Sequence, residues 1–142
     1  MKPIIISDTL IPKIPLDQTS TKRFVIVDTA MNDLIRPTLY QAFHNVIPVK
    51  NNKRYSMGPA EIVGPVCETG DLLASNITLP KLSEGDLLVI ETTGAYGAVM
   101  ASTYNSRLLV PEILVNRNKH CIIRPRPSYE MLMALDCMPD WL

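Results

Sequence analysis

The run Gly64-Pro65-Val66-Cys67-Glu68-Thr69-Gly70-Asp71 places a thiol beside a carboxylate, between two glycines. Because glycine and proline interrupt regular structure, the run predicts a backbone turn, entered by a short apolar strand at 62–66. A turn directs side chains outward, which makes Cys67 a candidate proton donor or nucleophile and Glu68 a candidate cation binder. On these eight residues alone, a small apolar cysteine packed against the core is the simpler interpretation.

Short strands separated by turns recur on both sides of this run. The sequence has twelve prolines among 142 residues, which fits a chain of short strands with frequent loops. Many short strands at turn-rich spacing favour a mainly β fold, either a barrel or a sandwich. Strands are expected at 24–27, 62–66 and 87–90, with a strand or loop at 72–76 and a strand pair at 112–115 and 121–123.

Only short helices are expected. Pro37 suits the first position of a helical turn, with Leu39, Tyr40 and Phe43 on one side. Ser128 is placed to cap a last helix over 129–135. Gly94 and Gly97 predict a tight bend between strands.

Composition limits the classes of function. The length favours one domain. The 14 basic and 14 acidic residues balance, which argues against a nucleic-acid-binding face. No apolar run approaches the roughly 20 residues that span a bilayer, and the start lacks the apolar stretch of a secretory signal. The cysteines Cys67, Cys121 and Cys137 have no metal-type spacing and cannot all pair, so a reducing cytoplasm is the simplest setting.

Two further segments change how the thiol turn is interpreted. One is 23–40, which contains Asp28-Thr29-Ala30-Met31-Asn32-Asp33 and Arg36-Pro37-Thr38-Leu39-Tyr40. The other is Gly94-Ala95-Tyr96-Gly97, followed by Tyr104-Asn105-Ser106-Arg107. With Cys67-Glu68-Thr69-Gly70-Asp71, in this order and at these separations, they resemble the C-terminal domain of the diaminopimelate decarboxylases. These enzymes use pyridoxal phosphate, make lysine and belong to the alanine racemase-like fold type III.

The resemblance runs from about Lys22 to Leu142 and includes 123–130. It implies a C-terminal β-barrel domain at 23–142, preceded by an irregular segment at 1–22 with a possible first strand. Ala30 stands where the family has glycine, Thr69 replaces serine and keeps the hydroxyl, and Leu108 and Leu109 replace Pro and Arg. None of these differences removes a charged group that we assign to chemistry.

The resemblance also implies roles for particular residues. Cys67 would deliver a proton at the partner subunit's cofactor, and Glu68 would bind the substrate's distal ammonium. Arg36 would bind the distal carboxylate through its planar fork. Tyr40, one helical turn further on, would add a hydroxyl donor, and Tyr96 would lie beside cofactor and substrate. The simpler alternatives are a surface ion pair between Arg36 and Asp33, and a core aromatic at Tyr96.

Other polar residues are expected to be structural. We expect Asp28, Asn32 and Asp33 to fix the strand-to-helix turn, and Tyr104, Asn105 and Arg107 to act as support or as dimer contacts. His44 and His120 are isolated and lack ligand partners, so no metal site is expected.

The family's N-terminal α/β barrel has no counterpart among these 142 residues. In the family, that barrel carries the lysine that forms the imine with pyridoxal phosphate and the loops that hold its phosphate. The chain alone is therefore expected to be inactive, with the barrel and the second subunit of a homodimer as partners and an amino acid as substrate. An inactive remnant, a stand-alone binding β-domain and another amino-acid decarboxylase of the same fold remain alternatives.

Overall fold

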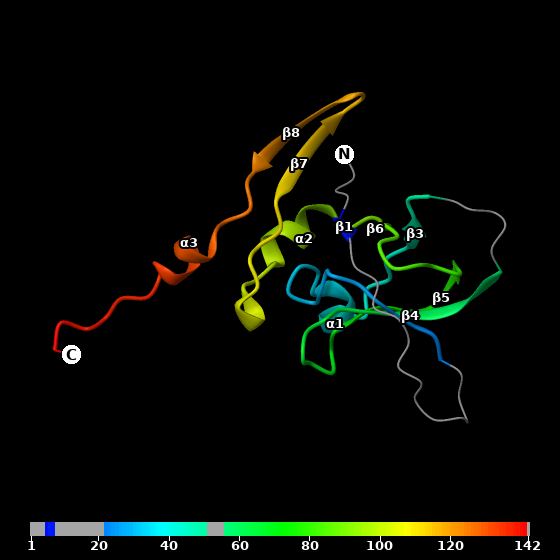
Figure 1. Cartoon of the computed structure of the whole chain (residues 1–142), viewed down its shortest axis with the longest axis horizontal. Helices are drawn as coiled ribbons and strands as arrows, with labels where there is room; N and C mark the ends of the chain where they lie inside the picture. Colours follow the sequence, from blue (N-terminus) through cyan, green and yellow to red (C-terminus); the bar gives the residue numbers. More distant parts are fainter. Residues whose placement is uncertain (1–4, 8–21, 51–55, 142) are drawn as a thin grey trace.

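The computed structural model describes residues 5–7, 22–50 and 56–141, and Figure 1 shows the strands before residue 91 gathered in one body from which the C-terminal part extends. One sheet has the order β2-β4-β5 and a second has the order β1-β6-β3. A third is the hairpin β7-β8. The strands are β1 (Ile5–Ser7), β2 (Phe24–Ile26), β3 (Val46–Pro48), β4 (Met57–Val63), β5 (Leu72–Pro80), β6 (Leu88–Ile90), β7 (Glu112–Asn116) and β8 (Lys119–Arg124).

The first two sheets share one hydrophobic core. β2 runs parallel to β4, and the other strand pairs are antiparallel. Side chains from both sheets join the same buried cluster, and removing that apolar surface from water drives the two sheets together. The mainly β prediction is confirmed, although in the described part of the chain no sheet closes into a barrel. The cluster comprises Val25, Val27, Leu34, Val46, Ala60, Ile62, Leu73, Ile77, Leu79, Leu88 and Ile90.

Several predicted strands are confirmed with shifted ends. β4 begins at Met57 and ends at Val63, three residues before the predicted end, because Gly64 N–H already bonds to the Asp71 carbonyl across the turn. β5 continues to Pro80, well beyond the predicted stretch. β1 lies in the segment 1–22, where the resemblance implies a possible first strand, and residues 1–4 and 8–21 lie outside the described residues.

Three short α-helices and one 3₁₀ helix, η1 (Tyr104–Ser106), complete the described structure. Pro37 lies at the start of α1 (Arg36–Tyr40), as predicted. Ser128 caps α3 (Tyr129–Met133) by accepting a hydrogen bond from Met131 N–H, although the helix ends before Leu135. Among the residues that the structure describes, no helix has the length and apolar character needed to cross a bilayer.

The prediction of a tight bend at Gly94 and Gly97 is wrong, because these residues begin helix α2 (Gly94–Met100). Gly94 has a φ of +61°, so the left-handed backbone is confined to this one residue, and the chain then continues as a helix. Gly97 is buried in α2, where a Cβ would lie 3.9 Å from Leu34 Cδ1. Gly97 is therefore a buried helical residue within ordinary contact distance of the core and not part of a turn.

Candidate functional site

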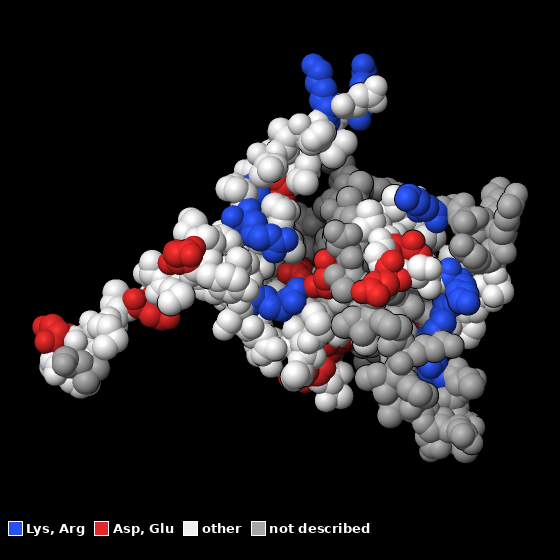
Figure 2. All heavy atoms as spheres, in the orientation of Figure 1, with Lys and Arg blue, Asp and Glu red and all other residues white. Residues whose placement is uncertain are grey.

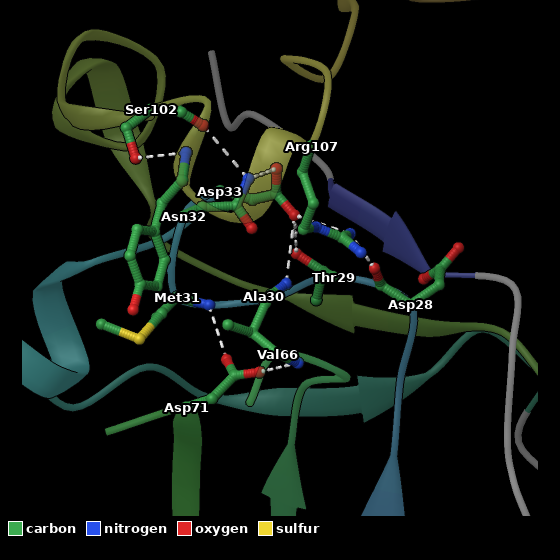
Figure 3. A network of polar contacts seen from close by, with 11 residues as sticks. Asp28, Thr29, Ala30, Met31, Asn32, Asp33, Val66, Asp71, Ser102 and Arg107 are labelled. Carbon is green, nitrogen blue, oxygen red and sulfur yellow. Dashed lines mark hydrogen bonds and ion pairs between the residues drawn. The ribbon is translucent and has the colours of Figure 1, made fainter. Parts of the chain in front are cut away.

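The thiol turn, residues 64–71, connects β4 to β5 and is held by the buried carboxylate of Asp71. Asp71 Oδ2 accepts a hydrogen bond from Val66 N–H at 2.8 Å, and Oδ1 accepts one from Met31 N–H at 2.7 Å (Figure 3). A Cβ on Gly64 would lie 2.3 Å from Asp71 Oδ2, so this close approach requires glycine. The carboxylate therefore fixes the turn to the segment that precedes α1.

A second contact joins the same turn to helix α1. The Thr38 hydroxyl donates to the carbonyl oxygen of Gly70, and a Cβ on Gly70 would lie 2.7 Å from Thr38 Cγ2. Cys67 and Glu68 remain exposed on this fixed turn. Cys67 is a free thiol, so the structure does not support a cysteine packed in the core.

The segment before α1 is organised around the buried carboxylate of Asp33. Its oxygens accept hydrogen bonds from Ala30 N–H at 3.0 Å, the Thr29 hydroxyl at 3.2 Å and the Asn32 side-chain amide at 3.1 Å. Arg107 forms an ion pair with it at 3.5 Å, and also donates to the Asp28 carbonyl oxygen (Figure 3). The segment fixes the strand-to-helix turn, as predicted, and Arg107 acts as its support.

Arg36 lies against two tyrosine rings and not against Asp33. Its guanidinium carbon is 5.7 Å from the centre of the Tyr40 ring and 5.1 Å from that of Tyr96. Cations placed over aromatic faces at this separation are attracted by the ring quadrupole. The alternative of an Arg36–Asp33 ion pair is wrong, because in the described part of the chain Arg36 has no ion-pair partner and Asp33 pairs with Arg107.

This cluster of Arg36, Tyr40 and Tyr96 joins α1 to α2, and its aromatic members face outward. Tyr40 is 58% exposed and Tyr96 is 62% exposed, so neither ring is a core aromatic. An arginine held by two rings offers donors in a fixed plane, a geometry that matches a carboxylate.

Glu68 has Tyr104 as its partner, a residue expected from the sequence to act as support or as a dimer contact. The Tyr104 hydroxyl donates to Glu68 Oε2 at 3.2 Å. The hydrogen bond to the Glu68 carboxylate, together with its negative charge, raises the pKa of the Tyr104 phenol. The motif Tyr104-Asn105-Ser106-Arg107 signalled that this segment matters, but the contact depends on tertiary structure.

The predicted residues form two groups. Arg36, Tyr40 and Tyr96 make one, and Cys67 and Glu68 occupy the thiol turn. The link between them runs through α1, where Thr38 contacts Gly70. Within the described ranges no group of three His, Cys, Asp or Glu residues has metal-site geometry. His44 is buried, with Nδ1 3.1 Å from the Glu91 carbonyl oxygen, and is therefore a core residue.

Comparison with known proteins identifies the family to which the chain belongs. Residues 7–94 match the model of the pyridoxal-dependent decarboxylase C-terminal sheet domain. The chain is 49% identical over 129 residues to the diaminopimelate decarboxylase of Zymomonas mobilis, covering 91% of this chain and 30% of the relative. The chain thus spans about 30% of the length of the curated relative.

Solved structures agree with the sequence comparison. The diaminopimelate decarboxylase of Helicobacter pylori complexed with L-lysine superposes with a TM-score of 0.82 at 40% identity, covering 93% of this chain and 31% of that one. The enzyme of M. jannaschii in co-complex with L-lysine gives a TM-score of 0.84 at 31% identity, covering 98% and 31%. Both similarities extend over nearly the whole chain and under a third of the larger enzyme.

Proposed function

We propose that this chain, which belongs to the family of pyridoxal-dependent decarboxylase C-terminal sheet domains, is the C-terminal part of a diaminopimelate decarboxylase. It would supply substrate-binding and proton-transfer residues for converting meso-2,6-diaminopimelate to L-lysine with pyridoxal phosphate. The observation that carries this proposal is Arg36 held over two exposed tyrosine rings, on a helix fixed to the exposed Cys67-Glu68 turn.

Arg36 is assigned to the substrate's distal carboxylate. A guanidinium forms two parallel hydrogen bonds with a carboxylate, and here the ring contacts restrict the plane in which it presents them. Tyr40, on the same short helix, is assigned a hydroxyl contact to the same end of the substrate. This pairing favours diaminopimelate over diamino acids that lack a second carboxylate.

Glu68 is assigned to binding the substrate's distal ammonium, and Cys67 is assigned to donating a proton. A carboxylate and an ammonium form a charge-assisted hydrogen bond, stronger than a neutral one. After CO2 leaves, the α-carbon must take up a proton, and the Cys67 thiol is an exposed donor on a turn that Asp71 holds. In this role the thiol delivers its proton at the cofactor of a second subunit, so the active enzyme is a homodimer.

The residues present fit one edge of a pyridoxal phosphate site. When bound, pyridoxal phosphate withdraws electrons from the reacting carbon. Tyr96 is exposed beside Arg36 on α2, where its ring and hydroxyl are available to a group packed from outside. The described lysines flank strands: Lys22 precedes β2, Lys50 follows β3, Lys81 follows β5 and Lys119 begins β8. Because the chain spans about 30% of the length of its curated relative, the cofactor's lysine is assigned to the α/β barrel that the rest of such an enzyme would supply.

Two consequences follow for the chain alone and for its setting. Without the barrel lysine, the isolated chain should release no CO2 from diaminopimelate. The three cysteines are free and exposed, which fits a reducing compartment such as the cytoplasm.

The test joins this chain to the α/β barrel of a relative and measures CO2 release from meso-diaminopimelate. Cys67→Ala should lower kcat by about 10²–10⁴-fold, the usual contribution of a proton-transfer group, with the cofactor's absorbance retained. Cys121→Ala is the matched control, since Cys121 is an exposed thiol on the β7-β8 hairpin. Equal kcat in the Cys67 and Cys121 variants would remove Cys67 from the mechanism.

A further inference from the structure

Tyr104 contacts the carboxylate that the proposed function assigns to the substrate's ammonium. Its hydroxyl lies 3.2 Å from Glu68 Oε2, and the backbone N–H of Gly70 lies 3.5 Å from Oε1. An exposed glutamate otherwise samples several rotamers. The Tyr104 hydroxyl and the Gly70 N–H thus place a donor near each oxygen of Glu68, which favours one orientation of the carboxylate before any ligand arrives.

The chain around Tyr104 is anchored at both ends to the segment before α1. Ser102 N–H donates to the Asn32 carbonyl at 2.8 Å, and the Asn32 side-chain amide donates to the Ser102 carbonyl at 3.2 Å (Figure 3). At the other end, Arg107 pairs with Asp33. The same buried network that positions α1 therefore positions the phenol over the thiol turn.

The backbone next to Tyr104 is strained. Asn105 and Ser106 have φ values of +60° and +55°, two consecutive non-glycine residues in the left-handed region. Asparagine tolerates this region, but serine adopts it at a cost. Such strain persists where the surroundings impose it and clusters at functional sites. Here the strained residues lie between Tyr104 and Arg107, in a segment anchored at Ser102 and at Arg107.

We propose that Tyr104 is a positioning residue that orients Glu68 toward the substrate's distal ammonium and thereby contributes to substrate choice. The inference rests on the proposed function and extends it by one residue. A carboxylate has about four lone-pair sites, so donors from Tyr104 and Gly70 leave acceptor capacity for an ammonium. Tyr104 does not contact the reacting atoms in this role and acts through Glu68.

The first test is a double-mutant cycle in the barrel-joined enzyme with meso-diaminopimelate. Tyr104→Phe should raise KM about tenfold or more, since it removes a hydrogen bond to a charged group, while kcat stays within about twofold. Because Tyr104 acts through Glu68, the effect of adding Tyr104→Phe to Glu68→Gln should be much smaller than in the wild type. Additive effects, or a loss confined to kcat, would overturn the positioning role.

Tyr129→Phe is the matched control for this cycle. Tyr129 lies on α3, where it is 57% exposed, and it has no place in the proposed site. Its replacement should leave KM unchanged. An equal rise in KM for Tyr129→Phe would show that loss of any exposed phenol has this effect and would overturn the assignment to Tyr104.

A second readout does not depend on catalysis. In the 142-residue chain, ¹³C-labelled tyrosine NMR can follow ionisation of Tyr104 at alkaline pH, identified by the absence of its signal in Tyr104→Phe. Because the Glu68 carboxylate raises the pKa of this phenol, Glu68→Gln should lower it. An unchanged titration overturns the positioning claim. If the barrel-joined enzyme releases no CO2 but Glu68→Gln still lowers the Tyr104 pKa in the chain, the proposed function is contradicted. The Tyr104–Glu68 contact is then still supported.

Discussion

Two buried carboxylates, Asp33 and Asp71, determine where the exposed groups of this site lie. Each is at most 4% exposed, and each accepts backbone N–H groups that would otherwise be buried without partners. Burial of a charge is costly unless hydrogen bonds compensate for it. The site therefore has a fixed interior beneath the half-buried Arg36 and the exposed tyrosine, cysteine and glutamate side chains.

Gly64 and Gly58 provide a matched pair for testing the Asp71 contacts. Gly64→Ala should displace the Asp71 carboxylate, because the new Cβ would lie 2.3 Å from Oδ2. The expected loss of stability is about 1.5–3 kcal/mol for each hydrogen bond to the carboxylate that breaks. Gly58→Ala should be close to neutral, since a Cβ there meets nothing within 4 Å. Urea denaturation of both variants gives the comparison, and equal stabilities would contradict the role given to Asp71.

At the scale of elements, α1 and α2 bring the aromatic rings to Arg36. α1 has one and a half turns and α2 has two, so neither would be stable in isolation. Tertiary packing holds them: Thr38 bonds to the thiol turn, and buried Gly97 lies against Leu34. Because the two short helices are held by these tertiary contacts, the cluster of Arg36, Tyr40 and Tyr96 depends on the packing of α1 and α2 on the core.

The two glycines of α2 should respond to alanine in opposite directions. At Gly97 a Cβ would lie 3.4 Å from Thr93 Cβ, an ordinary contact, so Gly97→Ala should stabilise by about 0.4–1 kcal/mol through the unfolded state. Gly94 has a φ of +61°, so Gly94→Ala should cost about 1–2 kcal/mol. Thermal unfolding of both variants measures the difference. Destabilisation by both substitutions would show that α2 is packed more tightly than described.

Sequence reasoning found the strands better than the site contacts. β-branched runs predicted β2 and β6, and the polar turn 116–119 predicted the β7-β8 hairpin, because these signals are local. Helix α2 was missed because two glycines indicate a turn unless the packing of Gly97 is known. The Arg36–Tyr40 contact follows from a spacing of four residues, whereas the Glu68–Tyr104 contact joins residues 36 positions apart.

For the whole molecule, the exposed apolar surface is large and unevenly placed. The hairpin and α3 extend from the body in Figure 1, and their side chains are mostly exposed. Figure 2 shows basic and acidic side chains interspersed on the face drawn, so no single charge dominates that face. Soluble monomers keep contiguous apolar patches to a few hundred Å². We call residues 112–141, which include the hairpin and α3, the C-terminal arm. Its exposed apolar residues include Tyr129, Met131, Met133, Leu135, Met138 and Trp141.

The isolated chain should therefore self-associate through this C-terminal arm, which in the proposed enzyme packs on the barrel and the second subunit. Sedimentation should show an average mass that rises with concentration. Met133→Lys combined with Leu135→Lys should reduce this rise without loss of fold, because both side chains are at least 70% exposed. A monodisperse monomer over a wide concentration range would contradict the prediction.

We propose that this chain recognises the carboxylate and the ammonium at the far end of diaminopimelate. Arg36→Ala in the barrel-joined enzyme leaves a substrate carboxylate unpaired in a closed site, a loss of roughly 2–5 kcal/mol. Arg36→Lys keeps the charge and removes the planar fork. Arg126→Ala, at an exposed position outside the site, serves as the control.

We would measure kcat/KM for meso-diaminopimelate and for D-lysine, which has the configuration of the reacting centre and lacks the distal carboxylate, in the wild type and these three variants. The wild type and Arg126→Ala should both show a strong preference for diaminopimelate. Arg36→Lys should lose part of that preference and Arg36→Ala most of it. An unchanged preference in Arg36→Ala would show that Arg36 does not bind the distal carboxylate.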